Sequence, residues 1–421
     1  MSDKSPFKNP LHRLASSLKD LRKRHQDRHR PTGFGFLLAD RISYLDADRW
    51  DELADCGSLF LRRKLLQVIE NHGPENLESR YAMIFRGQQP VALLAAQLIA
   101  VCGESLTRTG ASAGLLRRTK AATRAASAHL RERMLVAGNL LSWGFDGIAF
   151  APGHDPAELW PGVAEALYRI RRAERLHGQT DFVMVKDLTV RQSGLESLRR
   201  FSYRPLKTEP NMVLELDPSW RNYEDYLGAL DAKYRRNTKE QARKLAAGGC
   251  TVEPLNDLSA VSGRLHELYF SVHSNASVRL VTLPETYFPA LAEAAGPDFR
   301  CLVIRRRDEI LGFVTTLRND KTAIAYYIGF DRSAAAEGLP LYLRLLHATI
   351  AQAIEWRCQR LSLGRTALEP KAALGAKPEE MGVWIRHRVP ALNWVLRGLL
   401  GAVPHAEAPE RSPFKKVVAQ E

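Results

Sequence analysis

The residues best suited to chemistry lie in one polar loop in the second half of the chain. Residues 361–363 are expected to form a short strand that ends at Gly364, and the loop beyond it holds Arg365, Glu369 and Lys371. Glu369 is suited to act as a general base. Alternatively, Lys371 is suited to hold a carboxylate or phosphate group of one reactant while Arg365 orients the other reactant. An ion pair that pins the loop accounts for the same residues, so both interpretations stay open.

A second polar turn precedes this loop. The strand expected over residues 322–330 contains Tyr327, and a small-residue loop then runs from Arg332 to Gly338 and Leu339, where a helix opens. Such a unit directs backbone N–H groups and the positive end of the helix to one spot, which suits a phosphate. Tyr327 is suited to offer its phenol to an oxyanion or a leaving group, although a buried core tyrosine is the more common explanation.

Helices and strands alternate around these candidates in a plan that occurs twice. In the first half we expect helices at 50–56, 59–71, 157–176 and 195–201, and strands at 81–85, 91–101, 140–150, 182–186 and 211–216. In the second half we expect helices at 223–247, 258–272, 284–295 and 340–356, and strands at 251–254, 299–305, 310–317, 322–330, 361–363 and 383–387. A whole plan that repeats indicates duplication of a domain, and hence an α/β fold with mixed sheets in two tandem lobes.

The boundary between the two lobes is expected near Asp217. The segments are a basic N-terminal arm (1–34), a first lobe (35–217), a second lobe that carries the candidate site (218–400) and a C-terminal tail (401–421). In the first lobe, Lys186 and Asp187 follow a strand at the position that matches Gly364 and Arg365, but the glycine is absent. We therefore expect the first lobe to be structural or to bind the acceptor.

Composition narrows the class of protein. The 421 residues, 45% of them hydrophobic, suffice for two cores. Five cysteines without a closely spaced pair argue for a reducing compartment and against a disulfide framework or a structural metal site. No signal peptide or membrane-spanning stretch is evident, so we expect a cytoplasmic protein that is at most peripheral to the inner membrane face.

The formal net charge of +14 favours anionic partners such as nucleic acid, phosphorylated carriers or an acidic membrane surface. The N-terminal arm combines basic residues with leucines at helical spacing, and it either docks on such a surface or packs on the protein itself. The helix at 223–247 places Arg236, Lys239 and Arg243 on one face. That face either follows RNA phosphates or is simply solvated.

The same segments resemble a known family. Residues 327–331, the turn at Gly338 and Leu339, the helix after it, and the loop from Leu363 to Lys371 are similar to the C-terminal lobe of the FemAB-like and BioF2-like acyltransferases of the GNAT superfamily. Residues 230–237 and 243–245 resemble the basic helix that opens that lobe. Residues 50–53 and 85–92 resemble the first lobe of the same proteins.

This resemblance implies two GNAT-like sheets and transfer of an acyl group to an amine, in cell-envelope or lipid metabolism. The donor would be acyl-CoA, as in most GNAT enzymes, or aminoacyl-tRNA, as in the Fem peptidoglycan enzymes, with no permanently bound cofactor and no metal. The usual acetyl-CoA signature, Q/R-x-x-G-x-G/A, fails after Arg332 because the next glycine is Gly338. A larger carrier, either acyl carrier protein or tRNA, therefore fits better.

The candidate site divides into two groups. The expected catalytic residues are Glu369, Lys371 and Tyr327, and the expected donor-binding residues are Arg332, Gly338, Leu339, Gly364 and Arg365. A different class of function fits the same features: a non-catalytic protein with the GNAT fold that binds RNA or an acidic membrane surface.

Overall fold

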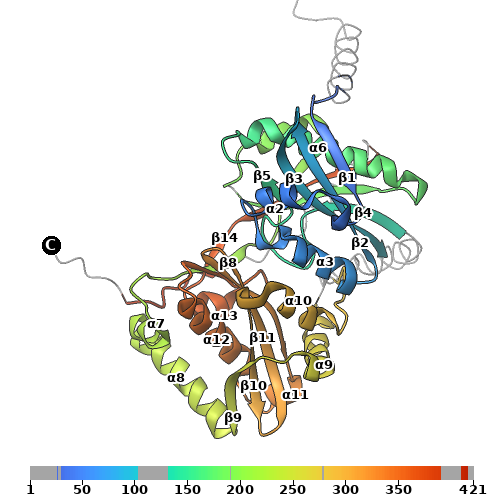
Figure 1. The fold of residues 1–421 in the computed structure, drawn as a ribbon. Coiled ribbons are helices and arrows are strands. Elements are labelled where there is room, and N and C mark those ends of the chain that lie inside the picture. Colours follow the sequence, from blue (N-terminus) through green and yellow to red (C-terminus); the bar gives the residue numbers. More distant parts are fainter. Residues whose placement is uncertain are drawn as a thin grey trace, which may run out of the picture.

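The structure is a computed structural model that describes Gln26 and residues 30–102, 131–189, 191–276, 279–389 and 409–415. Two mixed β-sheets with helices packed on them form two lobes (Figure 1), which confirms the expected fold class. Most of the expected arm at 1–34, and residues 401–408 and 416–421 of the expected tail, lie outside the described residues. Within the described ranges, no helix combines the length and apolar character needed to cross a membrane.

The sheet of the first lobe has the order β1-β2-β3-β4-β6-β15-β7, with β5 paired to β3. In β2, Ala82 and Ile84 point into the hydrophobic cluster under α6, whereas Tyr81 and Met83 point into the cluster that includes Trp50 of α2. Alternation along one strand therefore places helices on both faces. The elements are β1 (Gly35–Ala39), α2 (Ala47–Ala54), α3 (Arg63–His72), β2 (Leu77–Arg86), β3 (Gln89–Cys102), β4 (Arg131–Ala137), β5 (Ile148–Phe150), α6 (Pro156–Ala173), β6 (Phe182–Thr189) and β7 (Arg204–Lys207).

The sheet of the second lobe has the order β14-β8-β13-β12-β11-β10-β9. Leu346 and Ile350 of α12 pack with β8 and β13 on one face, and α9 and α10 pack on the other. The elements are β8 (Asn211–Glu215), α7 (Tyr223–Ala229), α8 (Ala232–Ala247), β9 (Cys250–Leu255), α9 (Ser262–His273), α10 (Tyr287–Ala295), β10 (Phe299–Arg306), β11 (Glu309–Asn319), β12 (Thr322–Phe330), α11 (Arg332–Ala336), α12 (Leu341–Glu355), β13 (Arg360–Ser362), α13 (Leu368–Ala373), β14 (Lys377–Glu379) and β15 (Met381–His387).

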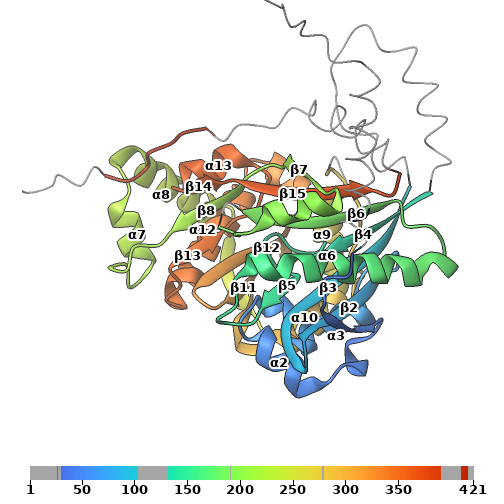
Figure 2. The ribbon, with the colours of Figure 1, turned by 90° about the horizontal axis from the view of Figure 1, so that it is seen from above.

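The two lobes share one plan and exchange one strand each. In the first lobe β4 and β6 are parallel and α6 lies between them in the chain, and in the second lobe β12, α12 and β13 repeat that arrangement. The next strand in each sheet comes from the other half of the chain: β15 pairs with β6, and β8 pairs with β13. Figure 2 shows β15 between β6 and β7. Strand pairing therefore crosses the expected boundary near Asp217 in both directions.

A continuous hydrophobic cluster joins the lobes. It contains Phe60, Leu65 and Ile69 from the first half of the chain together with Phe288 and Leu291 from α10 of the second half. Side chains from α3 and α10 thus form a shared core, so burial of apolar surface holds the lobes together.

Two sequence-based expectations were wrong. Of the expected strand at 140–150, the structure forms only β5. Gly138 and Gly144 have positive φ angles of 129° and 132°, which a regular strand does not allow. The backbone of Gly147 also lies so close to the backbone of Gly138 that no Cβ fits there. The expected helix at 223–247 is broken into α7 and α8. The break at Leu230 is filled by the tail, which pairs with Leu230 through Phe414.

The tail residues 409–415 dock on the second lobe beside α13. The backbone N–H of Asp231 donates to the Pro413 carbonyl at 2.8 Å, and the N–H of Lys415 donates to the Ala229 carbonyl at 3.0 Å. The Phe414 ring packs against Tyr226 and fills the space next to Gly375, which has a φ of 98°. The tail therefore forms part of the packed second lobe.

Candidate active site at the junction of the lobes

The strands β12 and β13 separate soon after they pair. Their parallel register covers only Thr322–Ile324 of β12, although β12 continues to Phe330. On its other side, β12 pairs with β11 through a bulge, because Thr315 lies opposite Tyr327 and Thr316 lies opposite Ala325. A bulge bends a strand and re-aims its side chains, which opens the sheet at this edge.

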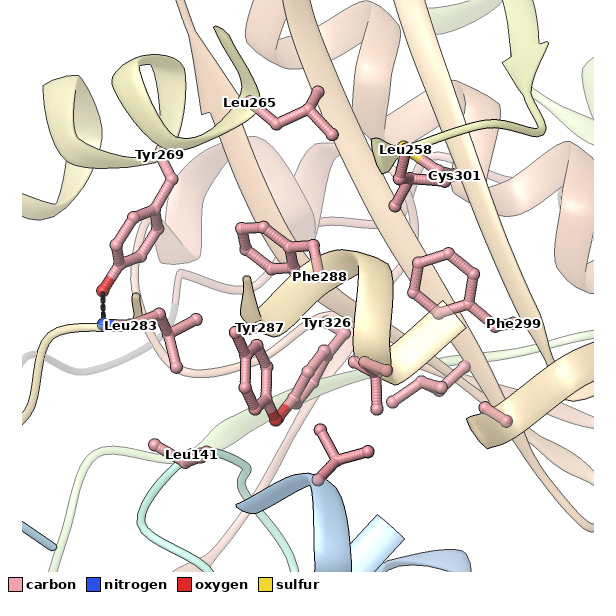
Figure 3. Close-up of a cluster of buried hydrophobic side chains, with 14 of the residues drawn as sticks. Leu141, Leu258, Leu265, Tyr269, Leu283, Tyr287, Phe288, Phe299, Cys301 and Tyr326 are labelled. Carbon is pink, nitrogen blue, oxygen red and sulfur yellow. Dashed lines mark hydrogen bonds between the residues drawn. The ribbon is translucent and has the colours of Figure 1, made fainter. Parts of the chain in front are cut away.

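Because of the bulge, the side chains of the consecutive residues Tyr326 and Tyr327 both point toward the interface between the lobes. The ring centroids of Tyr326 and Tyr327 lie 4.7 Å apart, which a regular strand with alternating side chains does not allow. The Tyr326 hydroxyl bonds to the Tyr287 hydroxyl at 2.7 Å, and both rings lie in the cluster of Figure 3. The Tyr327 hydroxyl donates to the carbonyl of Leu141 in the first lobe at 3.2 Å. The phenol of Tyr327 is therefore already used as a donor.

The turn after β12 is closed by Asp331. Its carboxylate accepts the N–H groups of Ser333 at 2.9 Å and Ala334 at 3.1 Å, and Arg264 contacts its second oxygen at 3.2 Å. The hydrogen bond from the Ser333 hydroxyl is the first cause that lowers the pKa of Asp331. The backbone N–H groups at the start of α11, which the sequence suggested for a phosphate, are thus already paired with a carboxylate.

The other residues of this turn lie at the surface. Arg332 and Gly338 are exposed, and Gly338 has a φ of 95°. Leu339 packs on the cluster that includes Leu245 and Leu341. The next helix, α12, begins after Pro340 without a side-chain cap.

Gly364 and Arg365 lie where the two lobes meet. Asn211 of β8 accepts the N–H of Gly364 at 3.1 Å, and the Gly364 φ of 79° lets the chain pass the Trp143 ring of the first lobe. Arg365 then forms an ion pair with Asp187, the residue that the sequence placed at the matching point of the first lobe. Burial lowers the pKa of Arg365 to about 10.

Asp187 belongs to a buried polar network of the first lobe. The Lys186 ammonium donates to Asp187 at 2.5 Å and to the carbonyls of Asn139 and Ser142, each at 2.9 Å. Burial, followed by the charge of Arg365, lowers the pKa of Lys186. Three hydrogen bonds nevertheless use all three of its N–H groups, so we infer that Lys186 keeps its proton.

A cleft of about 480 Å³ lies between the lobes beside this network. Asp146 lines it and accepts hydrogen bonds from Ser58 at 2.7 Å and Ser142 at 2.5 Å, while burial raises its pKa. The opposite wall includes Asn211 and Ser362, which are linked to each other at 3.0 Å. The cleft thus offers hydrogen-bonding groups from both lobes.

Glu369 and Lys371 point in different directions from α13. Residues two apart on a helix do not share a face. Glu369 is exposed and its carboxylate pairs with Arg411 of the tail at 2.5 Å. Lys371 is 3% exposed, and in the described part of the chain its ammonium makes no hydrogen bond or ion pair. Burial lowers the pKa of Lys371 to about 7, against a smaller opposing effect from Glu209.

The eight predicted site residues therefore occupy separate places. Gly364, Arg365 and Tyr327 lie at the junction of the lobes, Lys371 is buried on α13, and Glu369 is at the surface. The residues Arg332, Gly338 and Leu339 lie beyond the far end of β12. No group of three or more His, Cys, Asp or Glu side chains within the described residues is arranged to hold a metal.

Sequence reasoning missed Asp146, Ser58 and Asn211. Asp146 lies in a segment predicted as a strand, and Ser58 is an isolated serine before an apolar run. The only signal was positional: the sequence placed the Lys186–Asp187 pair at the point that matches Gly364 and Arg365. The structure puts this pair inside β6 and brings Asp187 into contact with Arg365.

Comparison with known proteins identifies the fold. Residues 232–372 match the model of the acetyltransferase (GNAT) domain. This segment is therefore similar to a GNAT domain. The segment includes the divergent strands, α11, α12 and Lys371, so the expected resemblance to the GNAT superfamily is confirmed. Comparison with curated protein sequences finds no match.

Solved structures extend the likeness to both lobes. FemX has a TM-score of 0.53 at 11% identity, with 84% of this chain and 98% of FemX covered. The fold of the chain is therefore the two-lobed FemAB-like GNAT fold. A tandem GNAT protein from the clavulanic acid biosynthesis pathway has a TM-score of 0.48 at 11% identity, covering 84% of this chain and 98% of its own. The DUF2156 domain of a lysylphosphatidylglycerol synthetase from Agrobacterium fabrum has a TM-score of 0.45 at 12% identity, covering 83% and 94%.

Proposed function

We propose that the chain transfers an acyl or aminoacyl group from an activated carrier to an amine, and that Lys371 is the catalytic base. The observation that carries the proposal is a buried lysine within the GNAT domain, with a pKa of about 7 and no hydrogen-bond partner in the described residues. A base is most effective when its pKa lies near the working pH. Lys371 meets that condition because it is buried.

In the proposed reaction, one bond to the acyl carbon forms and another breaks. The acceptor nitrogen forms a bond to the acyl carbon, and the carbon–sulfur bond of a thioester or the carbon–oxygen bond of an ester breaks. Neutral Lys371 takes the proton that the amine loses and passes it to the departing sulfur or oxygen, so the carrier leaves as a thiol or an alcohol. Holding the amine and the carbonyl in line contributes about 7–11 kcal/mol to lowering the barrier.

The donor we propose is a carrier larger than CoA, either acyl carrier protein or aminoacyl-tRNA. Two observations support this choice: Asp331 already pairs with the N–H groups at the start of α11, and the glycine spacing of the acetyl-CoA signature is absent. The cleft between the lobes, lined by Asp146 and Asn211, is the proposed place for the body of the acceptor, whose amine must extend beyond this lining to reach Lys371.

Mass spectrometry of products tests the reaction. The purified protein is incubated with acetyl-CoA, acyl carrier protein thioesters or aminoacyl-tRNA and a set of primary amines. We expect kcat/KM to rise with pH through about 7, and Lys371→Met to lower the rate at least about 100-fold. Lys321→Met, on an exposed turn, is the matched control.

Two further variants separate the roles of the charged residues. Lys371→Arg restores a positive charge that cannot accept a proton near neutral pH, so recovery of activity would contradict the base role. Glu369→Gln should keep most activity because Glu369 pairs with Arg411 at the surface. Absence of product with every donor, together with salt-sensitive binding of tRNA, would instead favour a non-catalytic binding protein.

A further inference from the structure

An arginine-lined pocket lies on the first lobe, away from the junction with the second lobe. Its volume is about 460 Å³, and α6, the segment before β6 and the residue after β15 contribute to it (α6 is labelled in Figure 1). The lining residues are Tyr168, Arg171, Arg172, Arg175, Gln179, Thr180 and Arg388. Four of these seven residues are arginines and none is acidic.

The positive charge of this pocket is only partly neutralised. Arg388 pairs with Asp181 at 2.8 Å. Among the described residues, Arg171, Arg172 and Arg175 form no ion pair, and the nearby Glu174 pairs with Arg80 and Arg133 instead. Three arginines therefore line the same pocket, and none of them is paired with a carboxylate of the described residues.

Arg171 shows the consequence of this crowding. Its side chain is half-buried, and burial, followed by the charges of Arg386 and then Arg388, lowers its pKa. Arginines in the last turn of a helix also meet the negative end of the helix dipole. That effect accounts for Arg171 and Arg172 but not for Arg388, which comes from a different element.

A buried hydroxyl in the wall of the pocket lacks a partner. Thr180 is 3% exposed, and its Oγ1 forms no hydrogen bond within the described part of the chain. A buried polar atom without a partner costs free energy, so such an atom in a native protein calls for an explanation. A ligand with hydrogen-bond acceptors would use this hydroxyl and the arginines together.

We propose that this pocket binds a phosphate group of a soluble phosphorylated ligand. Guanidinium groups donate paired hydrogen bonds that match the oxygens of a phosphate, and a hydroxyl supplies a further donor. An adjoining pocket of about 240 Å³ shares Tyr168 and Arg172 and adds Arg386 together with the carboxylate of Glu165, so it suits the rest of the ligand better than a second phosphate. The site is concave, so it fits a discrete group better than the flat surface of a bilayer.

Calorimetric titration with pyrophosphate at low salt is the first test. Arg172→Gln combined with Arg175→Gln removes two charges from the pocket. Arg236→Gln combined with Lys239→Gln removes two charges from α8 in the second lobe and serves as the control. We expect the pocket variant to bind at least about tenfold more weakly and the control to bind like the parent protein. Equal weakening in both variants, or no binding by the parent protein, would overturn the proposal.

Thr180→Val gives a second, independent test. The change removes only the unpartnered hydroxyl, so the unliganded protein should keep or raise its melting temperature. Pyrophosphate binding should nevertheless weaken by about tenfold, because a hydrogen bond to a charged group is lost. Unchanged affinity in Thr180→Val would remove the hydroxyl from the proposed site.

The source of the phosphate is distinguished with vesicles of phosphatidylcholine that contain phosphatidylglycerol. If the ligand is soluble, removal of the Arg172 and Arg175 charges weakens pyrophosphate binding at least about tenfold and leaves vesicle binding unchanged. Vesicle binding that the same variant abolishes, and that pyrophosphate does not displace, would contradict a soluble ligand. These measurements need no transfer activity, so their outcome is separate from that of the proposed acyl transfer.

Discussion

Arg365 and Asp187 form an ion pair that links the two sheets at equivalent positions of the two lobes. Arg365 follows β13 of the second lobe, and Asp187 lies in β6 of the first lobe. Asp187 is fully buried and also accepts hydrogen bonds from Lys186 and from the backbone N–H of Gly144. One carboxylate therefore serves two cations, and its loss affects more than the link between the lobes.

The two partners of this ion pair should differ in their importance for stability. Asp187→Asn removes the carboxylate that pairs with both Lys186 and Arg365, and we expect it to cost about 3–5 kcal/mol. Arg365→Met leaves Asp187 still paired with Lys186, so the loss should be smaller, about 1–3 kcal/mol. Urea unfolding of both variants measures the difference, with Arg221→Met at an exposed position as the control. Equal losses in the two variants would show that Lys186 does not depend on Asp187.

The stability of the protein should depend on the ionisation of Lys371. The folded pKa of about 7 lies below the ordinary value of 10.5, so the unfolded chain binds one more proton between these pH values. Raising the pH through this window should therefore stabilise the folded state, by up to about 1.4 kcal/mol per pH unit from this group. Unfolding of the parent protein and of Lys371→Met at pH 7 and pH 9 checks this. The pH dependence should be weaker in the variant, and identical curves would mean that Lys371 stays protonated when folded.

Adding a single methyl group at Gly375 should release the tail residues 409–415 from the second lobe. In Gly375→Ala the added Cβ would overlap the Phe414 ring, and the φ of 98° strains any side chain. We expect trypsin to cleave after Arg411 at least about tenfold faster, because proteolysis follows the population of the open form. Gly228→Ala, where the added Cβ meets no neighbouring atom, is the control. Glu369→Gln should also change cleavage little, since an exposed ion pair contributes about 0–1 kcal/mol.

The phenol of Tyr327 should matter for structure more than for chemistry. Tyr327→Phe removes the hydrogen bond to Leu141 and should destabilise the protein by about 1 kcal/mol. The transfer rate should fall by less than about tenfold, because the hydroxyl is already used as a donor. Product formation and thermal unfolding of the variant are measured together. A rate loss above about 100-fold at unchanged stability would instead give the phenol a catalytic role.

The sequence predicts most of the elements because their hydrophobic periodicity is local. The β2–β3 and β10–β11 hairpins, α6 and α12 all appear near their expected positions. Which strands pair with each other, however, is not determined by local sequence. The apolar character of β8 and β15 predicts strands, but nothing in either segment shows that it pairs with the sheet of the other half.

The candidate site was predictable to a similar degree. Arg365 and Lys371 were identified as polar residues in a loop, which their spacing allows. The sequence did not show that Arg365 pairs with Asp187, because this contact joins residues 178 positions apart. Nor did it show that Glu369 faces the tail and Lys371 the interior, since that depends on where α13 begins.

The position of β15 also bears on how the protein is made. Among the described strands, β7 joins its sheet only through β15, and β6 lacks a neighbour on that side until β15 is added. A ribosome that has synthesised all of β1 to β7 therefore still holds an incomplete sheet with an exposed edge. The nascent first lobe must wait for almost the whole second lobe to emerge, so separate expression of residues 1–217 should yield a protein prone to aggregation.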